Sequence, residues 1–373
     1  MKVVLHLTSS CNLRCKYCYA PAKRKDSMSR DTARRAIDLG LSLAGPSACV
    51  AYFGGEPLLQ FAAIQELTRH AEEQAARRGI TMHFRMATNG TLFTDESLAF
   101  CRDHHILYAI SLDGDRAAHD SARVTAGGAG SFALIDGKLD AILAHNPHTV
   151  VTSVITPATV PRLLPSIEYM WRRGLRYVFH QLDYTHPDWT PAIFEDLEAS
   201  YRELAAFYLE RMRAGDRFHL GLFDDKLKTH AASPFKLGGV CDFGARRISV
   251  APDGRIYPCV QFVSDKPDAA NYCIGDVEHG LTPRRDELIA ENRSPRPQCA
   301  GCAHAGRCTN YCGCLNWQMT GAVTTVPAIM CAHERMLIPI ADAIGNELWS
   351  ERNARFLEKH YRAYDEQFVY SFD

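Results

Sequence analysis

Short apolar runs alternate with amphipathic stretches along the first two-thirds of the chain, and this alternation constrains the fold more than any other feature. The apolar runs are rich in Val, Ile, Phe and Tyr, as buried parallel strands usually are. Strand–helix repeats of this kind predict right-handed β/α units. Strands are expected at residues 3–8, 49–53, 83–88, 108–112, 150–155 and 177–181, and helices at 31–44, 61–78, 96–104, 131–145, 161–173 and 191–214.

Six such units predict an α/β fold with a partial (β/α)6 barrel of the TIM type, rather than a closed barrel of eight units. In such barrels the chemistry lies at the C-terminal ends of the strands. After about residue 216, cysteine, glycine and proline replace the helical pattern. A region with so few apolar core residues needs additional cross-links to be stable, and bound metal clusters can supply them. The predicted parts are a barrel (1–215), a bridging segment (216–240), a cysteine-rich domain with two clusters (241–335) and a helical tail (336–373).

The charge of the chain is nearly balanced, with 42 Lys and Arg against 43 Asp and Glu. Nucleic-acid-binding proteins usually have a basic excess or a basic face, so no nucleic-acid partner is predicted. Polar residues follow the short apolar run at the N-terminus at once, which does not fit a secretion signal. No stretch reaches the roughly 18 apolar residues of a membrane span. The protein is therefore expected in the cytoplasm, without a membrane partner.

The 14 cysteines fall mainly into an early group of three and a late group of nine, while Cys49 and Cys101 stand apart as expected core thiols. In a large cytosolic chain, grouped cysteines indicate metal or redox chemistry. The early group, Cys11, Cys15 and Cys18, directly follows the first expected strand. Three thiolates can hold three irons of a [4Fe–4S] cube and leave the fourth iron to the amino and carboxylate groups of S-adenosylmethionine (SAM). A zinc site, or a cluster with a distant fourth cysteine, is the alternative.

This CxxxCxxC pattern resembles the signature of the radical SAM superfamily. The resemblance continues at the ends of the next strands, where a Gly-Gly-Glu-Pro element, an Asn and a Ser-Leu-Asp-Gly element follow in order. It implies that the Gly-Gly-Glu-Pro element holds the SAM amino group and that Arg123 pairs with the SAM carboxylate. Taken singly, the element could be a turn and Arg123 a surface ion pair. The expected cofactor-binding residues are Tyr17, Gly54, Gly55, Glu56, Pro57, Asn89, Ser111, Asp113 and Arg123.

Seven late cysteines match the spacing of the SPASM domain, an extension found in radical SAM enzymes. The resemblance implies two auxiliary [4Fe–4S] clusters and therefore three clusters in all. It assigns Cys299, Cys302, Cys308 and Cys331 to the distal cluster, and Cys241, Cys259 and Cys312 to the nearer one. Cys273 or Cys314 would complete the nearer cluster, unless one iron stays open for a substrate ligand. A zinc ribbon is the alternative without the resemblance.

The resemblance implies an enzyme that cleaves SAM, abstracts hydrogen and oxidises or crosslinks a ribosomally made peptide, with the auxiliary clusters accepting electrons. Its partners would be that peptide or protein substrate and a reductant such as flavodoxin or ferredoxin. Because the first strand begins at Val3, leader recognition is expected on the cysteine-rich domain or on a separate protein. Asp183, after the sixth strand, is a candidate base, although a solvated loop aspartate is the simpler interpretation.

Three other functions stay open. Sulfatase maturases that form formylglycine have a similar layout, but they place an Asp base after the cysteine that matches Cys259, and this chain has Val260 there. A radical SAM dehydrogenase of a small molecule would need the same cofactor. A non-catalytic electron-transfer protein would keep the clusters, but it would not need the Gly-Gly-Glu-Pro element or Arg123.

Overall fold

The computed structural model describes residues 1–20, 22, 24–231, 241 and 243–361, which form two compact units. The first unit contains Met1–Leu112, His119–Val151 and Asp242–Asn292. The second contains Asp113–Ala118, Thr152–Cys241 and Arg293–Asp373. Residues 241–335, predicted as one cysteine-rich domain, are therefore shared between the two units. Among the described residues, no helix is long and apolar enough to cross a membrane.

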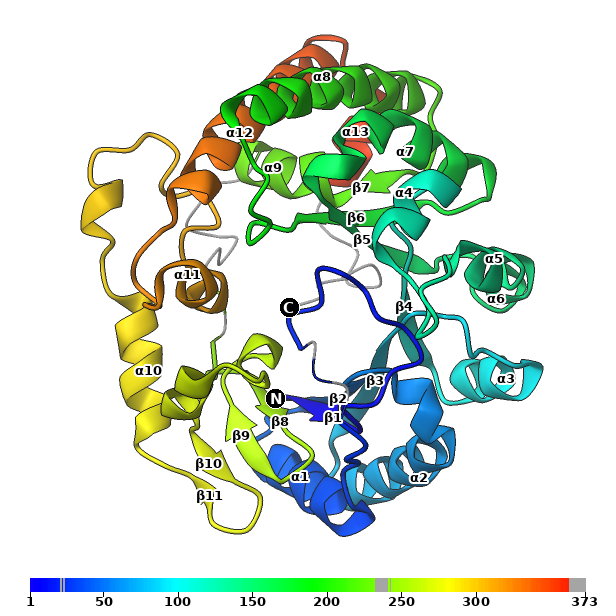
Figure 1. Cartoon of the computed structure of the whole chain (residues 1–373), viewed down its shortest axis with the longest axis vertical. Helices are drawn as coiled ribbons and strands as arrows, with labels where there is room; N and C mark the ends of the chain where they lie inside the picture. The colour runs from blue at the N-terminus through cyan, green and yellow to red at the C-terminus, as the bar shows by residue number, and fades with distance from the viewer. Residues whose placement is uncertain (21, 23, 232–240, 242, 362–373) are drawn as a thin grey trace. The chain divides into compact units, whose positions relative to one another are not determined.

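The first unit is built on a sheet with the strand order β11-β10-β9-β8-β1-β2-β3-β4. Strands β1 to β4 are parallel, and β8 adds to them as a parallel neighbour of β1, with Lys2 opposite Arg247. Figure 1 shows β1 and β8 side by side. The strands are β1 (Lys2–His6), β2 (Ser47–Phe53), β3 (Thr81–Thr88), β4 (Ile106–Ser111), β8 (Arg247–Val250), β9 (Arg255–Tyr257), β10 (Gly275–Asp276) and β11 (Gly280–Leu281). A segment of the cysteine-rich region thus extends the sheet next to β1.

Helices of the first unit cover one face of this sheet. Val3 of β1 packs against Gly40, where an added Cβ would lie 2.1 Å from the valine Cγ2. The Tyr52 hydroxyl of β2 bonds the Thr68 hydroxyl at 2.7 Å. Because side chains alternate along a strand, His6 and Phe53 must face away from the helices. The helices described for this unit, including those that do not cover the sheet, are α1 (Arg30–Ser42), η1 (Pro57–Gln60), α2 (Phe61–Arg77), α3 (Asp95–Asp103), α4 (Arg116–Ala122), α5 (Phe132–Asp136), α6 (Leu139–His145), η4 (Val260–Phe262), η5 (Pro267–Tyr272) and α10 (Arg284–Arg293).

The second unit continues the strand–helix alternation with β5, β6 and β7. A short strand and helix, β7 and α9, lie in the segment predicted only to bridge two domains, and residues 232–240 of that segment are outside the described residues. Its elements are β5 (Val150–Ile155), η2 (Pro157–Arg162), α7 (Leu163–Arg172), β6 (Tyr177–Leu182), α8 (Pro191–Arg213), β7 (His219–Leu220), α9 (Gly221–Ala231), η6 (Pro297–Cys299), α11 (Gly313–Thr320), α12 (Ala328–Ser350) and α13 (Ala354–His360). The six predicted strands are thus present as β1 to β6.

A buried carboxylate holds the last helix of the second unit in place. Asp224 of α9 is fully buried, and its carboxylate lies 2.6 Å from the Lys359 ammonium of α13. The Tyr208 hydroxyl of α8 also donates to it, at 2.7 Å. Burial works to raise the pKa of Asp224, but Lys359, His219 and His360 together outweigh it and hold that pKa well below its usual range. One ionised side chain therefore joins α8, α9 and α13.

Candidate active site

The loop with Cys11, Cys15 and Cys18 follows β1 at the C-terminal edge of the first unit's sheet. Two backbone hydrogen bonds fasten the loop to the end of α4 and the chain just after it, from Lys16 N to the Ala122 carbonyl at 3.0 Å and from Arg14 N to the Val124 carbonyl at 2.7 Å. All three cysteines are half-buried. The loop therefore presents three thiols from a backbone that is held at its middle.

Cys11 receives hydrogen bonds from its own loop and from the end of β3. The Leu13 N–H donates to the Cys11 sulfur at 3.4 Å. The Asn89 amide lies 3.9 Å from the same sulfur and also donates to the Asn12 side chain at 2.8 Å. Donors to a cysteine sulfur stabilise its thiolate and tune the potential of a bound cluster. The predicted cofactor residue Asn89 thus contacts Cys11, one of the predicted cluster ligands.

Gly54 and Gly55 end β2 against the backbone that enters the cysteine loop. Gly55 N donates to the Thr8 carbonyl at 2.7 Å, and Glu56 N donates to the Ser10 carbonyl at 2.9 Å. A Cβ at Gly54 would lie 2.4 Å from the Thr8 oxygen, and one at Gly55 would lie 2.1 Å from the Ser10 oxygen. The φ of +132° at Gly54 also favours glycine. These two positions need glycine because the backbones touch.

Glu56 joins the ends of β2 and β3 from a buried position. One carboxylate oxygen accepts from the Thr88 hydroxyl at 2.7 Å and from Leu58 N at 3.0 Å, and the other accepts from Asn89 N at 2.8 Å. Burial raises the pKa of Glu56, and these hydrogen bonds oppose the rise. Glu56 therefore fixes the backbone of Asn89, which in turn contacts Cys11. Pro57 begins η1 directly after it.

We expect Gly55→Ala to disrupt the cysteine loop. The new methyl group would meet the Ser10 carbonyl, which cannot move without shifting the chain that leads to Cys11. The free energy of unfolding should fall by about 1–3 kcal/mol, the usual cost of overpacking. Iron retained after anaerobic purification and thermal unfolding would measure the effect. Gly45→Ala is the matched control, because its Cβ would meet nothing within 4 Å. Equal iron content and stability in the two variants would contradict this account.

Tyr17 and Arg123 lie together beside the cysteine loop, as expected of two residues that share a ligand. The Arg123 guanidinium carbon is 5.3 Å from the centre of the Tyr17 ring. Arg123 is buried, and its carbonyl accepts from the Ser131 hydroxyl at 2.8 Å. Ser111 is half-buried at the last position of β4. Tyr17, Arg123 and Ser111 all belong to the unit that carries the loop.

Asp113 and Asp183 both belong to the second unit, and each carboxylate accepts hydrogen bonds there. The buried Asp113 carboxylate accepts from Val154 N at 2.9 Å. The Asp183 carboxylate accepts from Thr185 N at 3.1 Å and from the Thr185 hydroxyl at 2.6 Å, so it forms a turn just after β6.

His180 of β6 is a buried group that the sequence reasoning did not single out. Burial lowers its pKa to about 4, although the Asp113 carboxylate opposes this. Its Nδ1 has no hydrogen-bond partner among the described residues. The only sequence signal was its place near the end of a strand.

Four late cysteines line one hollow in the second unit, together with Asn310 and Glu334. They are the set predicted for the distal cluster, namely Cys299, Cys302, Cys308 and Cys331. Burial, followed by the Glu334 charge, raises the pKa of the Cys308 thiol to about 12, so binding iron there must displace a proton. The buried Asn310 Oδ1 has no partner among the described residues. Four thiols around one hollow fit an iron–sulfur cluster.

A buried ion pair supports this hollow. The Lys226 ammonium of α9 lies 2.7 Å from the Glu334 carboxylate of α12, and both side chains are buried. Glu334 also accepts from the Thr309 hydroxyl at 2.7 Å, and Lys226 donates to the Arg307 carbonyl at 3.4 Å. The ion pair therefore holds the residues on both sides of Cys308 by hydrogen bonds.

The cysteines predicted for the nearer cluster are divided between the units. Cys259 and Cys273 belong to the first unit, whereas Cys241, Cys312 and Cys314 belong to the second. The sulfurs of Cys312 and Cys314 are 3.6 Å apart. Within the described ranges, no three His, Cys, Asp or Glu side chains are arranged around a single metal ion. Outside both groups, Cys101 is buried as expected, but Cys49 is only half-buried.

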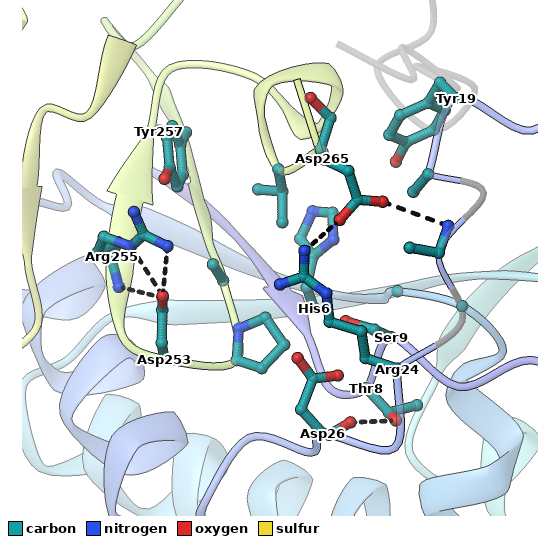
Figure 2. A pocket seen from close by; sticks show the side chains of 18 residues that line it. His6, Thr8, Ser9, Tyr19, Arg24, Asp26, Asp253, Arg255, Tyr257 and Asp265 are labelled. Carbon is teal, nitrogen blue, oxygen red and sulfur yellow. Dashed lines mark hydrogen bonds and ion pairs between the residues drawn. The ribbon is translucent and has the colours of Figure 1, made fainter. Parts of the chain in front are cut away.

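A pocket lies beside the cysteine loop in the first unit (Figure 2). Gly54 and Gly55 line it from β2, and residues 251–257 and 263–265 line it from the cysteine-rich region. Arg24 donates to Asp265 at 2.6 Å, and Arg255 donates to Asp253 at 2.7 Å. His6, from the last position of β1, lies among these charged groups in Figure 2. The pocket thus joins the expected SAM-binding glycines to the segment after Cys259.

Parallel strand–helix units with a three-cysteine loop after the first strand define an iron–sulfur enzyme built on a partial barrel. Residues 5–157 match the radical SAM superfamily. This part of the chain is a radical SAM domain, a class that uses SAM and a [4Fe–4S] cluster, and the whole chain resembles the anaerobic sulfatase-maturating enzymes and SuiB.

Related proteins cover most of the chain at low identity. The cysteine-type anaerobic sulfatase-maturating enzyme of Clostridium perfringens is 22% identical over 324 residues, which cover 82% of this chain and 86% of that protein. The serine-type enzyme of Klebsiella aerogenes is 23% identical over 321 residues, covering 81% and 77%.

Solved structures share the fold. The structure of anSMEcpe with bound AdoMet has a TM-score of 0.80 at 19% identity and covers 94% of this chain and 99% of its own. The structure of Streptococcus suis SuiB bound to the precursor peptide SuiA has a TM-score of 0.60 at 14% identity, covering 88% and 75%. These likenesses confirm the predicted α/β fold, with a partial barrel of parallel strands followed by a cysteine-rich C-terminal region.

Proposed function

We propose that this protein is a peptide maturase that oxidises or crosslinks a residue of a ribosomally made peptide. The observation that carries the proposal is the cysteine loop, which follows β1, is fastened at the end of α4, and is contacted by the glycines after β2 and by Asn89. Bound there, SAM and its cluster supply a 5′-deoxyadenosyl radical, which can remove hydrogen from an unactivated carbon. The chain itself has to hold the SAM, position the peptide and exclude water.

Arg123 and Tyr17 are proposed as the SAM-binding residues beside the loop. A planar guanidinium can grip the SAM carboxylate through two parallel hydrogen bonds. Burial of Arg123 limits its motion and its competition with water. The Tyr17 ring, 5.3 Å away, would pack beside the adenine. The backbone carbonyls of Gly54 and Gly55 are proposed as acceptors for the SAM amino group.

Two auxiliary [4Fe–4S] clusters are proposed as electron acceptors. The hollow lined by Cys299, Cys302, Cys308 and Cys331 supports the distal cluster. The nearer cluster would draw on Cys241, Cys259 and Cys312, with Cys273 or Cys314 as its fourth ligand. An electron acceptor near the substrate favours net oxidation over a redox-neutral reaction.

The peptide substrate is proposed from the relatives. Their names refer to sulfatase maturation, and solved neighbours hold a peptide named Cp18Cys or the precursor peptide SuiA. Formylglycine formation is the second candidate because the sulfatase maturases match most of the chain. Val260 weighs against it, because this position would have to supply an aspartate base.

Anaerobic reconstitution followed by addition of SAM and dithionite tests the proposal. We expect 5′-deoxyadenosine in liquid chromatography, and about twelve irons per chain from three cubes. Intact clusters without 5′-deoxyadenosine would end the enzyme assignment, and about four irons would reject the auxiliary clusters. The peptide assignment would fail if peptides encoded beside the gene, and sulfatase-derived peptides, never changed mass while SAM was consumed.

A further inference from the structure

The side chains of Asn12, Asn89 and Thr91 close a ring of three hydrogen bonds beside Cys11. The Asn12 amide N–H donates to the Thr91 hydroxyl at 2.8 Å, the hydroxyl donates to the Asn89 Oδ1 at 2.7 Å, and the Asn89 amide N–H donates to the Asn12 Oδ1 at 2.8 Å. Asn89 and Thr91 are 8% and 7% exposed, while Asn12 is half-buried. All three bonds run in one direction around the ring, an arrangement in which hydrogen bonds strengthen one another.

The ring leaves one polar hydrogen of Asn89 for the cysteine loop. The Asn89 Oδ1 accepts from the Thr91 N–H at 3.0 Å as well as from the Thr91 hydroxyl. One hydrogen of the Asn89 Nδ2 is given to Asn12, and the other is directed at the Cys11 sulfur, 3.9 Å away. Two positions on the oxygen and two on the nitrogen are thus occupied, which is the full hydrogen-bonding capacity of an amide.

The partners of the Asn89 amide fix its orientation. Turning the amide by 180° would bring its oxygen against the Asn12 oxygen and the Cys11 sulfur, which are both acceptors. The NH2 group would then face the Thr91 N–H, which is a donor. Because Asn89 is buried, water could do little to offset these losses. Asn12 and Thr91 therefore hold a donor, rather than an acceptor, toward Cys11.

We infer that Asn12 and Thr91 are positioning residues that set the reduction potential of the SAM-cleaving cluster by keeping the Asn89 N–H on the Cys11 sulfur. The inference rests on the [4Fe–4S] cluster of the proposed function and not on its peptide substrate. Reduction adds one electron, and therefore one negative charge, to the cluster and its thiolates. A donor at the sulfur stabilises the reduced form more than the oxidised form, so it raises the potential. Without the ring, the cluster would be harder to reduce.

Thr91→Val tests the inference, because valine keeps the branched shape of threonine but removes the hydroxyl that closes the ring. We expect the ratio of reduced to oxidised cluster at a fixed solution potential to fall about threefold to tenfold, a shift of at most about 59 mV for one electron. Thr91→Ser, which keeps the hydroxyl, should stay close to the unaltered protein. The measurement is a potentiometric titration of the anaerobic, reconstituted protein without SAM, followed by electron paramagnetic resonance. The signal that is missing from the triple alanine variant of Cys11, Cys15 and Cys18 belongs to this cluster.

Thr68→Val is the matched control, because Thr68 is buried in α2 and its hydroxyl bonds that of Tyr52 at 2.7 Å, outside the cysteine loop. It should lose stability, as Thr91→Val does, but its cluster potential should not change. If Thr91→Val does not retain the cluster, Asn12→Ala decides, since water can fill the gap at this half-buried position and the potential should again fall.

An unchanged or higher potential in the variant that decides would overturn the inference. An equal shift in Thr91→Ser or in Thr68→Val would overturn it as well, because the effect would then follow from altered packing and not from the hydroxyl. No SAM and no peptide are present, so these outcomes are independent of 5′-deoxyadenosine formation, which decides the proposed function separately.

Discussion

Replacing Cys11, Cys15 and Cys18 together by alanine is expected to abolish SAM cleavage and to remove about four of about twelve irons. The three thiols come from one loop, and no other cysteine is expected to replace them at that cluster. Without the cluster, SAM has neither an anchoring iron nor an electron donor. Iron analysis and 5′-deoxyadenosine formation under anaerobic conditions measure the two effects.

Cys49→Ala is the control for this triple substitution. Cys49 is half-buried in β2 and lies outside both cysteine groups. Its removal should leave iron content and SAM cleavage close to those of the unaltered protein. If the triple variant kept a full iron complement, or if Cys49→Ala lost as much iron, the early cysteines would not hold the cluster.

The main strands and the cysteine loop were readable from the sequence because each has a strong local signal. Strands β1 to β6 are five or more residues long, each contains several apolar residues, and helical patterns lie between them. Strand β7, Leu220 with His219, is too short to leave a period-two pattern, and α9 follows it without a clear polar face. Both lie in the segment that was predicted only as a bridge.

Polar residues at strand ends were harder to interpret than the cysteines. The sequence suggested Asp183 as a base, but its carboxylate bonds Thr185 two residues later, a pattern that Asp and Thr at this spacing often form. His6 was overlooked because it reads as one residue of a strand. Its place in the wall of the pocket depends on tertiary packing, because the other lining residues come from distant parts of the sequence.

The other interactions of the site could not be predicted because they join residues that are far apart in the sequence. Glu56 was expected to bind SAM, and its three donors come from the ends of β2 and β3, about 30 residues apart in sequence. The Lys226–Glu334 pair joins residues 108 positions apart. Neither arrangement has a local signature, because both depend on how the chain is packed.

Lys226→Met is expected to destabilise the second unit by about 3–5 kcal/mol, because it leaves the Glu334 carboxylate buried without its cation. Glu334 is only 3% exposed, so water can replace little of what the Lys226 ammonium supplies. The Arg307 carbonyl, next to Cys308, would lose its hydrogen bond from Lys226. Iron bound at the distal hollow should therefore be lost first. Denaturant unfolding of the anaerobic protein, followed by released iron, measures both effects.

The second half of a double-mutant cycle separates the ion pair from packing. Lys226→Met combined with Glu334→Leu removes both charges and fills similar space, so it should recover most of the lost stability. Lys228→Met is the control on the same helix, because its ion pair with Asp225 is largely exposed and should contribute at most about 1 kcal/mol. If Lys226→Met cost no more than Lys228→Met, or if the double variant were less stable than either single variant, the pair would not be what positions Cys308.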